Sequence, residues 1–338
     1  MLDAIDLNDH LLAVAEEHRW IPNAPRRAFQ SRQYRRAPRV REGRSFHAHP
    51  PRRYLIKNSI VTYLAFAQPD RGPRVGRIDG RVSEGLVAGT TVVVGSAQGI
   101  GEAVARRLAR ADWAGSLVLA DLDFKGAEAV AADLRNAGFE ARAAPVDLRL
   151  PESVDALVAA APGADRVAIV AGIFAAAPSL DVDRAEFERV LSVNLVGVYF
   201  VAQAFAKEMV KRGAGSICAV GSIAARMPRM RQAAYSASKA GMRQALRVLA
   251  LETVPAGVRI NFVAPGPTDT PMMRQLTRDH PHVDLAMGSP GAFRPPVPDR
   301  RVASSDEIAS AVAFLLSPDA DHIALHDLYV DGGETLGL

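Results

Sequence analysis

Short apolar runs alternate with longer segments of helical periodicity from residue 88 onward. The runs predict strands at 90–94, 117–121, 142–146, 167–171, 216–220, 258–263 and 327–330. The periodic segments predict helices at 99–108, 124–137, 183–212, around Tyr235 and at 305–316. Such alternation is typical of βαβ units, whose parallel strands are joined by right-handed crossovers. The sequence therefore predicts an α/β fold over residues 85–338, with a single doubly wound, Rossmann-type parallel sheet flanked by helices.

The first 84 residues lack this alternation. They hold 16 Lys and Arg against 9 Asp and Glu, whereas residues 85–338 hold 25 against 28. The pattern supports no more than a short helix over 11–20, a strand pair over 54–67 and a linker over 68–85. Because this composition cannot build a core, we expect a poorly ordered basic extension, or upstream sequence translated from a wrongly assigned start. A basic arm for an anionic partner is the alternative.

Composition excludes several classes of protein for residues 85–338. The slight excess of acidic residues there argues against nucleic-acid binding by this domain. No run of 18 apolar residues occurs, so no membrane-spanning helix is predicted. The single cysteine, Cys218, excludes an intramolecular disulfide and a cysteine metal site, and suits the cytoplasm. His322 and His326 have the spacing of metal ligands, but they flank an irregular segment without an evident third ligand, so we expect no metal.

A glycine-rich turn follows the first expected strand. Gly95 permits a tight strand-to-helix turn, Gly99 lets the backbone approach a pyrophosphate, and Gly101 allows close helix packing. The helix that follows offers unpaired N–H groups to a phosphate. Asp121 ends the second strand, where a carboxylate accepts the adenosine ribose hydroxyls and repels a 2′-phosphate. The pattern therefore predicts a dinucleotide site that favours NAD over NADP.

Tyr235 and Lys239 lie four residues apart and so share one face of a helix, and Ser222 precedes them. A free phenol titrates near ~10, and a nearby lysine cation lowers that pKa by favouring the phenolate. The Ser222 hydroxyl could hold a substrate oxygen while the phenol exchanges its proton. Alone, a Tyr-Lys pair at this spacing is more typical of a solvated helix face, so its weight depends on the other motifs.

Taken together, these motifs resemble the short-chain dehydrogenase/reductase family over about residues 88–338. The glycine turn, Asn194, Ser222 and the Tyr235–Lys239 pair occur in the family's order. Further matches are Asp147 after the third strand, the loop 265–270 and the tail 330–333. The resemblance implies an enzyme that binds a small-molecule substrate, and relatives of this kind usually assemble as homotetramers. A cofactor-binding regulatory protein that has lost turnover is the alternative from another class.

The resemblance also implies a role for each matched residue. Tyr235 would be the acid/base, Ser222 would orient the substrate oxygen, and Lys239 would lower the pKa of the tyrosine and bind the nicotinamide ribose. Asn194 would hold the water of a proton relay. The residues expected to contact NAD are Gly95, Gly99, Ile100, Gly101, Asp121, Asp147, Gly172, Lys239, Pro265, Gly266 and Thr270.

Two departures from the family pattern affect structural residues. Val94 stands where a threonine is usual before the first glycine, which removes a structural hydroxyl. Ile169 and Val170 stand where the family usually has two asparagines, so side-chain hydrogen bonds that tie its central sheet are missing. Neither change touches the catalytic groups, and we expect effects on stability or cofactor affinity instead.

Three local stretches resemble one branch of the family, the 2,3-dihydro-2,3-dihydroxybenzoate dehydrogenases of catechol-siderophore biosynthesis. They are 227–229, 268–272 and 322–337. That resemblance implies oxidation of a ring alcohol by NAD, followed by tautomerisation to a catechol. Arg229, between Ser222 and Tyr235, would bind the carboxylate of a cyclic substrate through two hydrogen bonds, or else be a solvated loop arginine.

The motifs do not single out one substrate. A dihydro-hydroxyanthranilate, or a generic secondary alcohol or ketone, would suit the same catalytic residues. The segment 273–300, rich in proline and histidine, is expected to cover the substrate, and it matches the branch least well.

Overall fold

The computed structural model describes residues 53–56, 59–62, 89–279 and 284–337. The chain divides into two units, Met1–Ile78 and Asp79–Leu338. In the first unit, β1 (Arg53–Ile56) pairs antiparallel with β2 (Ser59–Thr62), so a strand pair is present within a shorter span than expected. The helix expected over 11–20 lies outside the described residues, and the domain boundary expected after residue 84 stays a prediction.

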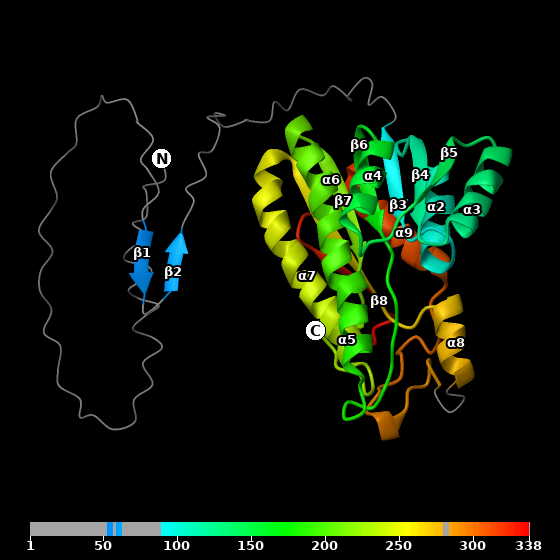
Figure 1. The fold of residues 1–338 in the computed structure, drawn as a ribbon. Helices are drawn as coiled ribbons and strands as arrows, with labels where there is room; N and C mark the ends of the chain where they lie inside the picture. Colours follow the sequence, from blue (N-terminus) through cyan, green and yellow to red (C-terminus); the bar gives the residue numbers. More distant parts are fainter. Residues whose placement is uncertain (1–52, 57–58, 63–88, 280–283, 338) are drawn as a thin grey trace, which may run out of the picture. The chain divides into compact units, whose positions relative to one another are not determined.

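Seven strands of the second unit form one all-parallel sheet in the order β5-β4-β3-β6-β7-β8-β9 (Figure 1). The order reverses between β3 and β6, which confirms the predicted doubly wound sheet. In such sheets ligands bind outside the carboxyl ends of the strands at the point of reversal. The strands are β3 (Thr90–Val94), β4 (Ser116–Asp121), β5 (Ala141–Pro145), β6 (Ala164–Ile169), β7 (Gly215–Val220), β8 (Val258–Pro265) and β9 (Asp327–Val330).

Helices cover both faces of the sheet. One layer comprises α2 (Gly99–Ala109), α3 (Phe124–Asn136) and α9 (Ser305–Leu316). The other comprises α4 (Pro151–Ala160), α5 (Arg184–Leu191), α6 (Val198–Arg212) and α7 (Ala233–Thr253). Side chains alternate between faces along a strand, so Val92 and Val94 join the core on one side and Val93 joins the other. Burial on both faces explains why these strands read as continuous apolar runs.

Two helices were not predicted from the periodicity. The first, α4, begins at Pro151, whose fixed φ and missing N–H group suit the first turn of a helix. The second, α8 (Pro271–Asp279), also begins at a proline and lies at the start of the segment expected to cover the substrate. The Thr270 hydroxyl accepts a hydrogen bond of 3.1 Å from the backbone N–H of Met273 and so caps its first turn.

The long helix expected over 183–212 is present, but its geometry changes along its length. Between α5 and α6 the segment Ser192–Gly197 is a π-helix, and Asn194 is buried within it. Among the described residues, Arg184–Arg212 is the one helix long and apolar enough to cross a membrane. Val201 and Phe205 of this helix are buried in the core beside the sheet. It is therefore a sheet-covering helix of the α/β unit.

The departures from the family pattern fall in the central strands. Val94 and Ile169 are buried apolar side chains of the core. The backbone carbonyl of Val94 accepts hydrogen bonds from the N–H groups of Val170 and Ala171, at 2.8 and 2.9 Å. Main-chain bonds therefore join the ends of β3 and β6 at this point.

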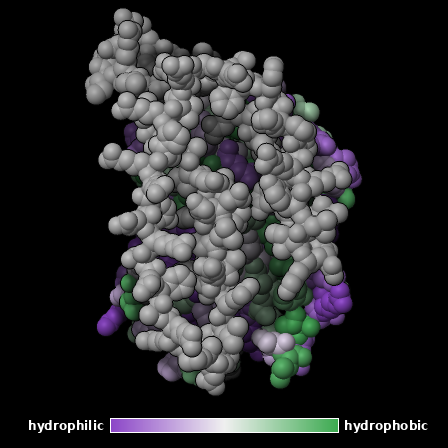
Figure 2. All heavy atoms as spheres, turned by 90° about the vertical axis from the view of Figure 1, so that its left-hand side faces the viewer, coloured by the Kyte–Doolittle hydropathy of each residue, from purple (hydrophilic) through white to green (hydrophobic). Residues whose placement is uncertain are grey.

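Apolar side chains also reach the surface of the α/β unit. The face in Figure 2 shows hydrophobic and hydrophilic residues beside one another. Phe200 on α6 and Leu251 on α7 are exposed by 51% and 63%. The expected homotetramer, joined through the long helices and the C-terminal strand, stays a prediction. The cytoplasmic location also stays a prediction; Cys218 itself is buried, and burial raises the pKa of its thiol to about 12.

Candidate active site

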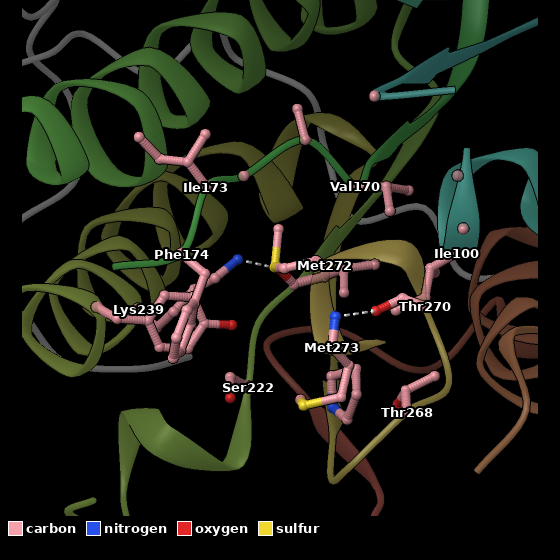
Figure 3. Close-up of a pocket in the computed structure, with 18 of the residues that line it drawn as sticks. Ile100, Val170, Ile173, Phe174, Ser222, Lys239, Thr268, Thr270, Met272 and Met273 are labelled. Carbon is pink, nitrogen blue, oxygen red and sulfur yellow. Dashed lines mark hydrogen bonds between the residues drawn. The ribbon is translucent and has the colours of Figure 1, made fainter. Parts of the chain in front are cut away.

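A cavity of about 480 Å³ opens at the carboxyl ends of the strands, beside the reversal between β3 and β6. Its wall includes most of the residues predicted from the sequence. Figure 3 labels Ile100, Ser222, Lys239 and Thr270 among them. One part of the wall is the glycine turn with the ends of β4 and β5, and another is the start of α7 with the segment after β7. The predicted residues on the wall are Gly95, Gly99, Ile100, Gly101, Asp121, Asp147, Gly172, Ser222, Arg229, Tyr235, Lys239, Pro265, Gly266 and Thr270.

The glycine turn has no room for side chains at two of its positions. Gly95 has a φ of +88°, and a Cβ atom there would lie 2.4 Å from the backbone nitrogen of Ala171. A Cβ atom on Gly101 would lie 1.7 Å from the carbonyl oxygen of Gly95. The backbone therefore forms a bare cradle at the N-terminus of α2, which fits the pyrophosphate of a dinucleotide.

Asp121 is the last residue of β4 and Asp147 lies two residues beyond the end of β5, and both line the part of the cavity that includes the glycine turn. The carboxylate of Asp121 accepts hydrogen bonds from the N–H groups of Ala97 and Asp123, both at 2.9 Å, so its orientation is fixed. Arg149 donates to both carboxylate oxygens of Asp147, at 2.9 and 2.6 Å. This hydrogen bonding lowers the pKa of Asp147. Contact of Asp147 with adenine stays a prediction, and its charge is already paired with that of Arg149.

Ser222, Tyr235 and Lys239 come from two elements that meet at the cavity. Ser222 follows β7, and its hydroxyl accepts a 3.1 Å hydrogen bond from the N–H of Ala224 in the 3₁₀ turn Ile223–Ala225. Tyr235 lies in the first turn of α7, and the Lys239 Nζ atom is 5.8 Å from the centre of its ring. Phe174 contacts that ring edge-on, at 5.0 Å between centroids. The serine, phenol and ammonium therefore face one cavity.

Burial dominates the ionisation of the tyrosine. It raises the pKa of Tyr235, and a hydrogen bond with Ser222 opposes the shift only in part. The lowered phenol pKa expected from Lys239 is therefore not found in this structure. The physical reason is desolvation, which disfavours the phenolate and here outweighs the opposing contribution. Lys239 donates a 2.9 Å hydrogen bond to the carbonyl of Val220, which holds its ammonium in place.

Lys239 is itself buried, with 3% of its surface exposed. Burial lowers its pKa from 10.5 to about 8. Between these two values the unfolded chain keeps a proton that the native protein has released, so the stability contributed at this residue rises with pH across the window. Below about pH 8 both states are protonated, and the full cost of burying the charge is present.

Substitution of Lys239 by methionine tests this assignment. We expect the free energy of unfolding of the wild type, minus that of Lys239→Met, to be constant below about pH 8 and to increase from about pH 8 to 10.5. Urea unfolding over a pH series measures the difference, with the surface variant Lys211→Met as control. A difference that stays flat across the window would contradict the lowered pKa.

Asn194 uses its side-chain amide to join α5–α6 to the loop after β6. Its Oδ1 atom accepts from the N–H of Ile173, and its Nδ2 atom donates to the carbonyl of Ile173, both at 2.8 Å. A third bond of 3.1 Å reaches the Ser238 hydroxyl. Gly172 leaves room for this arrangement, since a Cβ atom there would lie 3.2 Å from Asn194 Oδ1. Asn194 is fully buried and is not itself part of the cavity wall, but its amide holds the backbone of Ile173, which is. The expected proton-relay water stays a prediction.

The sequence analysis predicted Arg229 but missed two residues that contact it or lie beside it, Glu334 and Arg294. Arg229 is not a solvated loop arginine: its Nη2 atom donates to Glu334 Oε1 at 2.6 Å, and only 9% of its side chain is exposed. Arg294 also lines the cavity and lies 3.3 Å from the same oxygen. Glu334 is 105 residues from Arg229 in the chain, so no local spacing could have revealed the pair.

His322 and His326 do not belong to this site. The backbone N–H of His326 donates to Asn261 Oδ1 at 3.0 Å, which attaches the segment before β9 to β8. Among the residues that the structure describes, no three His, Cys, Asp or Glu side chains gather as a metal site.

Comparison with known proteins agrees with this geometry. A family model described as short chain dehydrogenase matches residues 89–281. The chain belongs to the short-chain dehydrogenase family. Within this family it is a dehydrogenase/reductase enzyme, so the alternative of a regulatory protein without turnover is not retained.

Three relatives of this short-chain dehydrogenase are each 36% identical to it. The 2,3-dihydro-2,3-dihydroxybenzoate dehydrogenase of Bacillus subtilis aligns over 76% of this chain and 99% of its own. A vibriobactin-specific enzyme of the same name from Vibrio cholerae aligns over 74% and 97%. The cis-4-hydroxycyclohexanecarboxylate dehydrogenase of Sinomonas cyclohexanicum aligns over 75% and 99%.

Solved structures support the family and its class of cofactor. A protein of Beutenbergia cavernae, described as an NAD(P)-dependent gluconate 5-dehydrogenase and holding NADP at low occupancy, is 30% identical with a TM-score of 0.67. It is covered over 98% of its length and matches 74% of this chain. An NAD(P) cofactor is typical of the family, and the glycine cradle of this chain fits one.

Proposed function

We propose that this enzyme uses NAD to oxidise a secondary ring alcohol of a cyclic carboxylate, with 2,3-dihydro-2,3-dihydroxybenzoate as the substrate and a catechol acid as the product. The observation that carries the proposal is the buried guanidinium of Arg229 in the wall that also holds Ser222 and Tyr235. A cation at this depth favours a substrate anion close to the reacting alcohol. The names of all three relatives above describe ring carboxylates, and two of them name this substrate.

The preference for NAD is supported by Asp121. Its carboxylate lies on the cavity wall with both oxygens already oriented by backbone N–H groups. A negative charge there accepts hydrogen bonds from ribose hydroxyls and repels a 2′-phosphate. The cradle of Gly95, Gly99 and Gly101 would hold the pyrophosphate, and Lys239 the nicotinamide ribose. When bound, the nicotinamide supplies the hydride acceptor.

The residues of the chain handle the proton in this proposal. The Ser222 hydroxyl donates a hydrogen bond to the substrate oxygen and so fixes the alcohol beside Tyr235. The phenolate of Tyr235 takes the O–H proton as the C–H hydride leaves the same carbon, so one proton and one hydride are removed together. The Lys239 ammonium, 5.8 Å from the centre of the ring, would favour the phenolate and so oppose the effect of burial on the pKa of Tyr235. Asn194 positions the loop that carries Ile173. The resulting ketone then tautomerises: a ring C–H proton is lost and the ketone oxygen gains a proton, which gives the aromatic product and draws the reaction forward.

A saturated hydroxycyclohexanecarboxylate is the second candidate, because the Sinomonas relative is named for one and is equally identical to this chain. A dihydro-hydroxyanthranilate or a simple secondary alcohol would suit the same proton-handling groups. The candidates differ in whether oxidation yields an aromatic ring and in whether a carboxylate is needed.

Kinetics with Arg229→Ala tests the need for a carboxylate. We expect KM for the dihydrodiol carboxylate to rise about ten- to a hundredfold, because a buried charge-assisted hydrogen bond is lost. The KM for the neutral dihydrodiol without a carboxylate, and the affinity for NAD, should change little. Arg231→Ala, in the exposed part of the same loop, is the control. Equal KM values for wild type and Arg229→Ala on the carboxylate would remove Arg229 from the substrate site.

A further inference from the structure

Two arginines share one carboxylate at the substrate end of the cavity. Arg229 Nη2 and Arg294 Nε lie 2.6 and 3.3 Å from the same oxygen of Glu334. The side chain of Glu334 is fully buried, and those of Arg229 and Arg294 are exposed by only 9% and 14%. The three come from the loop before α7, the segment before α9 and the C-terminal turn. Two cations and one anion leave an excess of one positive charge.

The hydrogen bonding of this trio is incomplete. Arg229 Nη1 and Glu334 Oε2 are buried atoms without a partner among the described residues. A guanidinium and a carboxylate can form two parallel bonds, but this pair forms one. Burial lowers the pKa of Arg229; the charge of Glu334 opposes this shift, and the smaller effect of the Arg294 charge adds to it. A buried guanidinium with an unpaired N–H group lowers the stability of the protein unless another anion accepts a hydrogen bond from it.

The excess charge faces the cavity. Arg229 and Arg294 both line it with Ser222 and Tyr235, whereas Glu334 is not part of the wall. Arg294 is held from two sides, because its Nη2 atom also donates to the carbonyl of Leu285 at 3.2 Å. Glu334 is held in turn by the C-terminal turn, in which Asp331 accepts from the N–H and hydroxyl of Thr335.

We propose that Arg294 is a specificity-determining residue, and that Arg229, Glu334 and Arg294 together form a site for a single carboxylate. Glu334 positions both guanidiniums, and its negative charge balances one of their two positive charges. The net charge of the site is therefore +1, which matches a monoanion better than a dianion. This inference rests on the proposed function, since it defines how the carboxylate of that substrate is recognised. It adds two residues from the far end of the chain to the site of Arg229.

Binding of benzoate, phthalate and benzamide to the NAD-loaded enzyme tests the site without turnover. These ligands share a ring and carry one, two and no negative charges. Isothermal calorimetry on the wild type should give tighter binding of benzoate than of benzamide. For Arg294→Gln we expect about a ten- to hundredfold loss of benzoate affinity with benzamide unchanged. For Glu334→Gln we expect the affinity ratio of phthalate to benzoate to rise about tenfold, because one negative charge has been removed.

Matched variants separate charge from folding. Arg231→Gln makes the same change at an exposed position of the loop before α7 and should leave all three affinities unchanged. Arg294→Lys keeps the charge without the planar fork, so it should keep more benzoate affinity than Arg294→Gln. If either Gln variant fails to fold, the same three affinities are measured on Arg294→Lys and Glu334→Asp instead. Unchanged benzoate and phthalate affinities relative to benzamide in the folded variants would overturn the inference.

The binding experiment can also succeed or fail independently of the proposed function. Benzoate binding that depends on Arg294, in an enzyme that does not oxidise the dihydrodiol, would support the carboxylate site and reject that substrate. Oxidation of the dihydrodiol carboxylate that is insensitive to Arg294→Gln would reject the site and leave the substrate standing.

Discussion

Tyr235→Phe is expected to lower kcat/KM for alcohol oxidation by about 10²- to 10⁴-fold, because it removes the group that takes the proton. The ring itself remains, so its edge-on contact with Phe174 at 5.0 Å and its place in the first turn of α7 should be preserved. The loss should fall on kcat, since the phenolate acts in the transition state.

Steady-state kinetics combined with a direct measurement of NAD binding checks this result. Tyr199→Phe, which removes a phenol from α6 outside the cavity wall, is the matched control and should retain wild-type turnover. A Tyr235→Phe enzyme within tenfold of wild-type kcat would contradict the role of the phenol. An enzyme that has also lost NAD affinity would point instead to a damaged cofactor site.

Asp121→Asn should reverse most of the proposed preference for NAD over NADP. The substitution keeps the shape of the side chain but removes the charge that would repel a 2′-phosphate on the ribose. We expect the ratio of kcat/KM for NAD to that for NADP to fall by about a hundredfold, through weaker ribose hydrogen bonds and loss of repulsion. The change should appear mainly in KM, because the adenosine end is far from the reacting carbon.

Kinetics with both cofactors measures this ratio. The control is Asp155→Asn, which makes the same charge change at an exposed position of α4. A wild-type enzyme that uses NADP as well as NAD, or an unchanged ratio in Asp121→Asn, would show that Asp121 does not select the cofactor.

Much of this fold and part of the site could be predicted because the signals are local. The strand patterns reflect burial on both faces, as Val92 and Val93 illustrate by joining opposite cores. Gly95 and Gly101 are required by contacts within their own turn and at the adjacent strand end, which a spacing pattern captures. Tyr235 and Lys239 lie one helical turn apart, so their shared face follows directly from their spacing.

Other features depend on contacts between distant segments. The Arg229–Glu334 pair joins residues 105 positions apart, and Arg294 reaches the same oxygen from a third segment. The raised pKa of Tyr235 follows from burial, which tertiary packing decides and a pair of residues does not. The π-helix around Asn194 interrupts a segment whose apolar periodicity indicated one uniform helix. In each case the missing information was the position of a neighbour that is remote in sequence.

The proposed oxidation is tested in a single reaction of purified enzyme, NAD and 2,3-dihydro-2,3-dihydroxybenzoate, with NADH and catechol absorbance followed together. We expect both to appear in equal amounts, NADP to replace NAD poorly, and Tyr235→Phe to lower both rates by about 10²-fold or more. A folded enzyme that binds NAD but forms neither product, while oxidising neutral alcohols freely, would contradict the proposal.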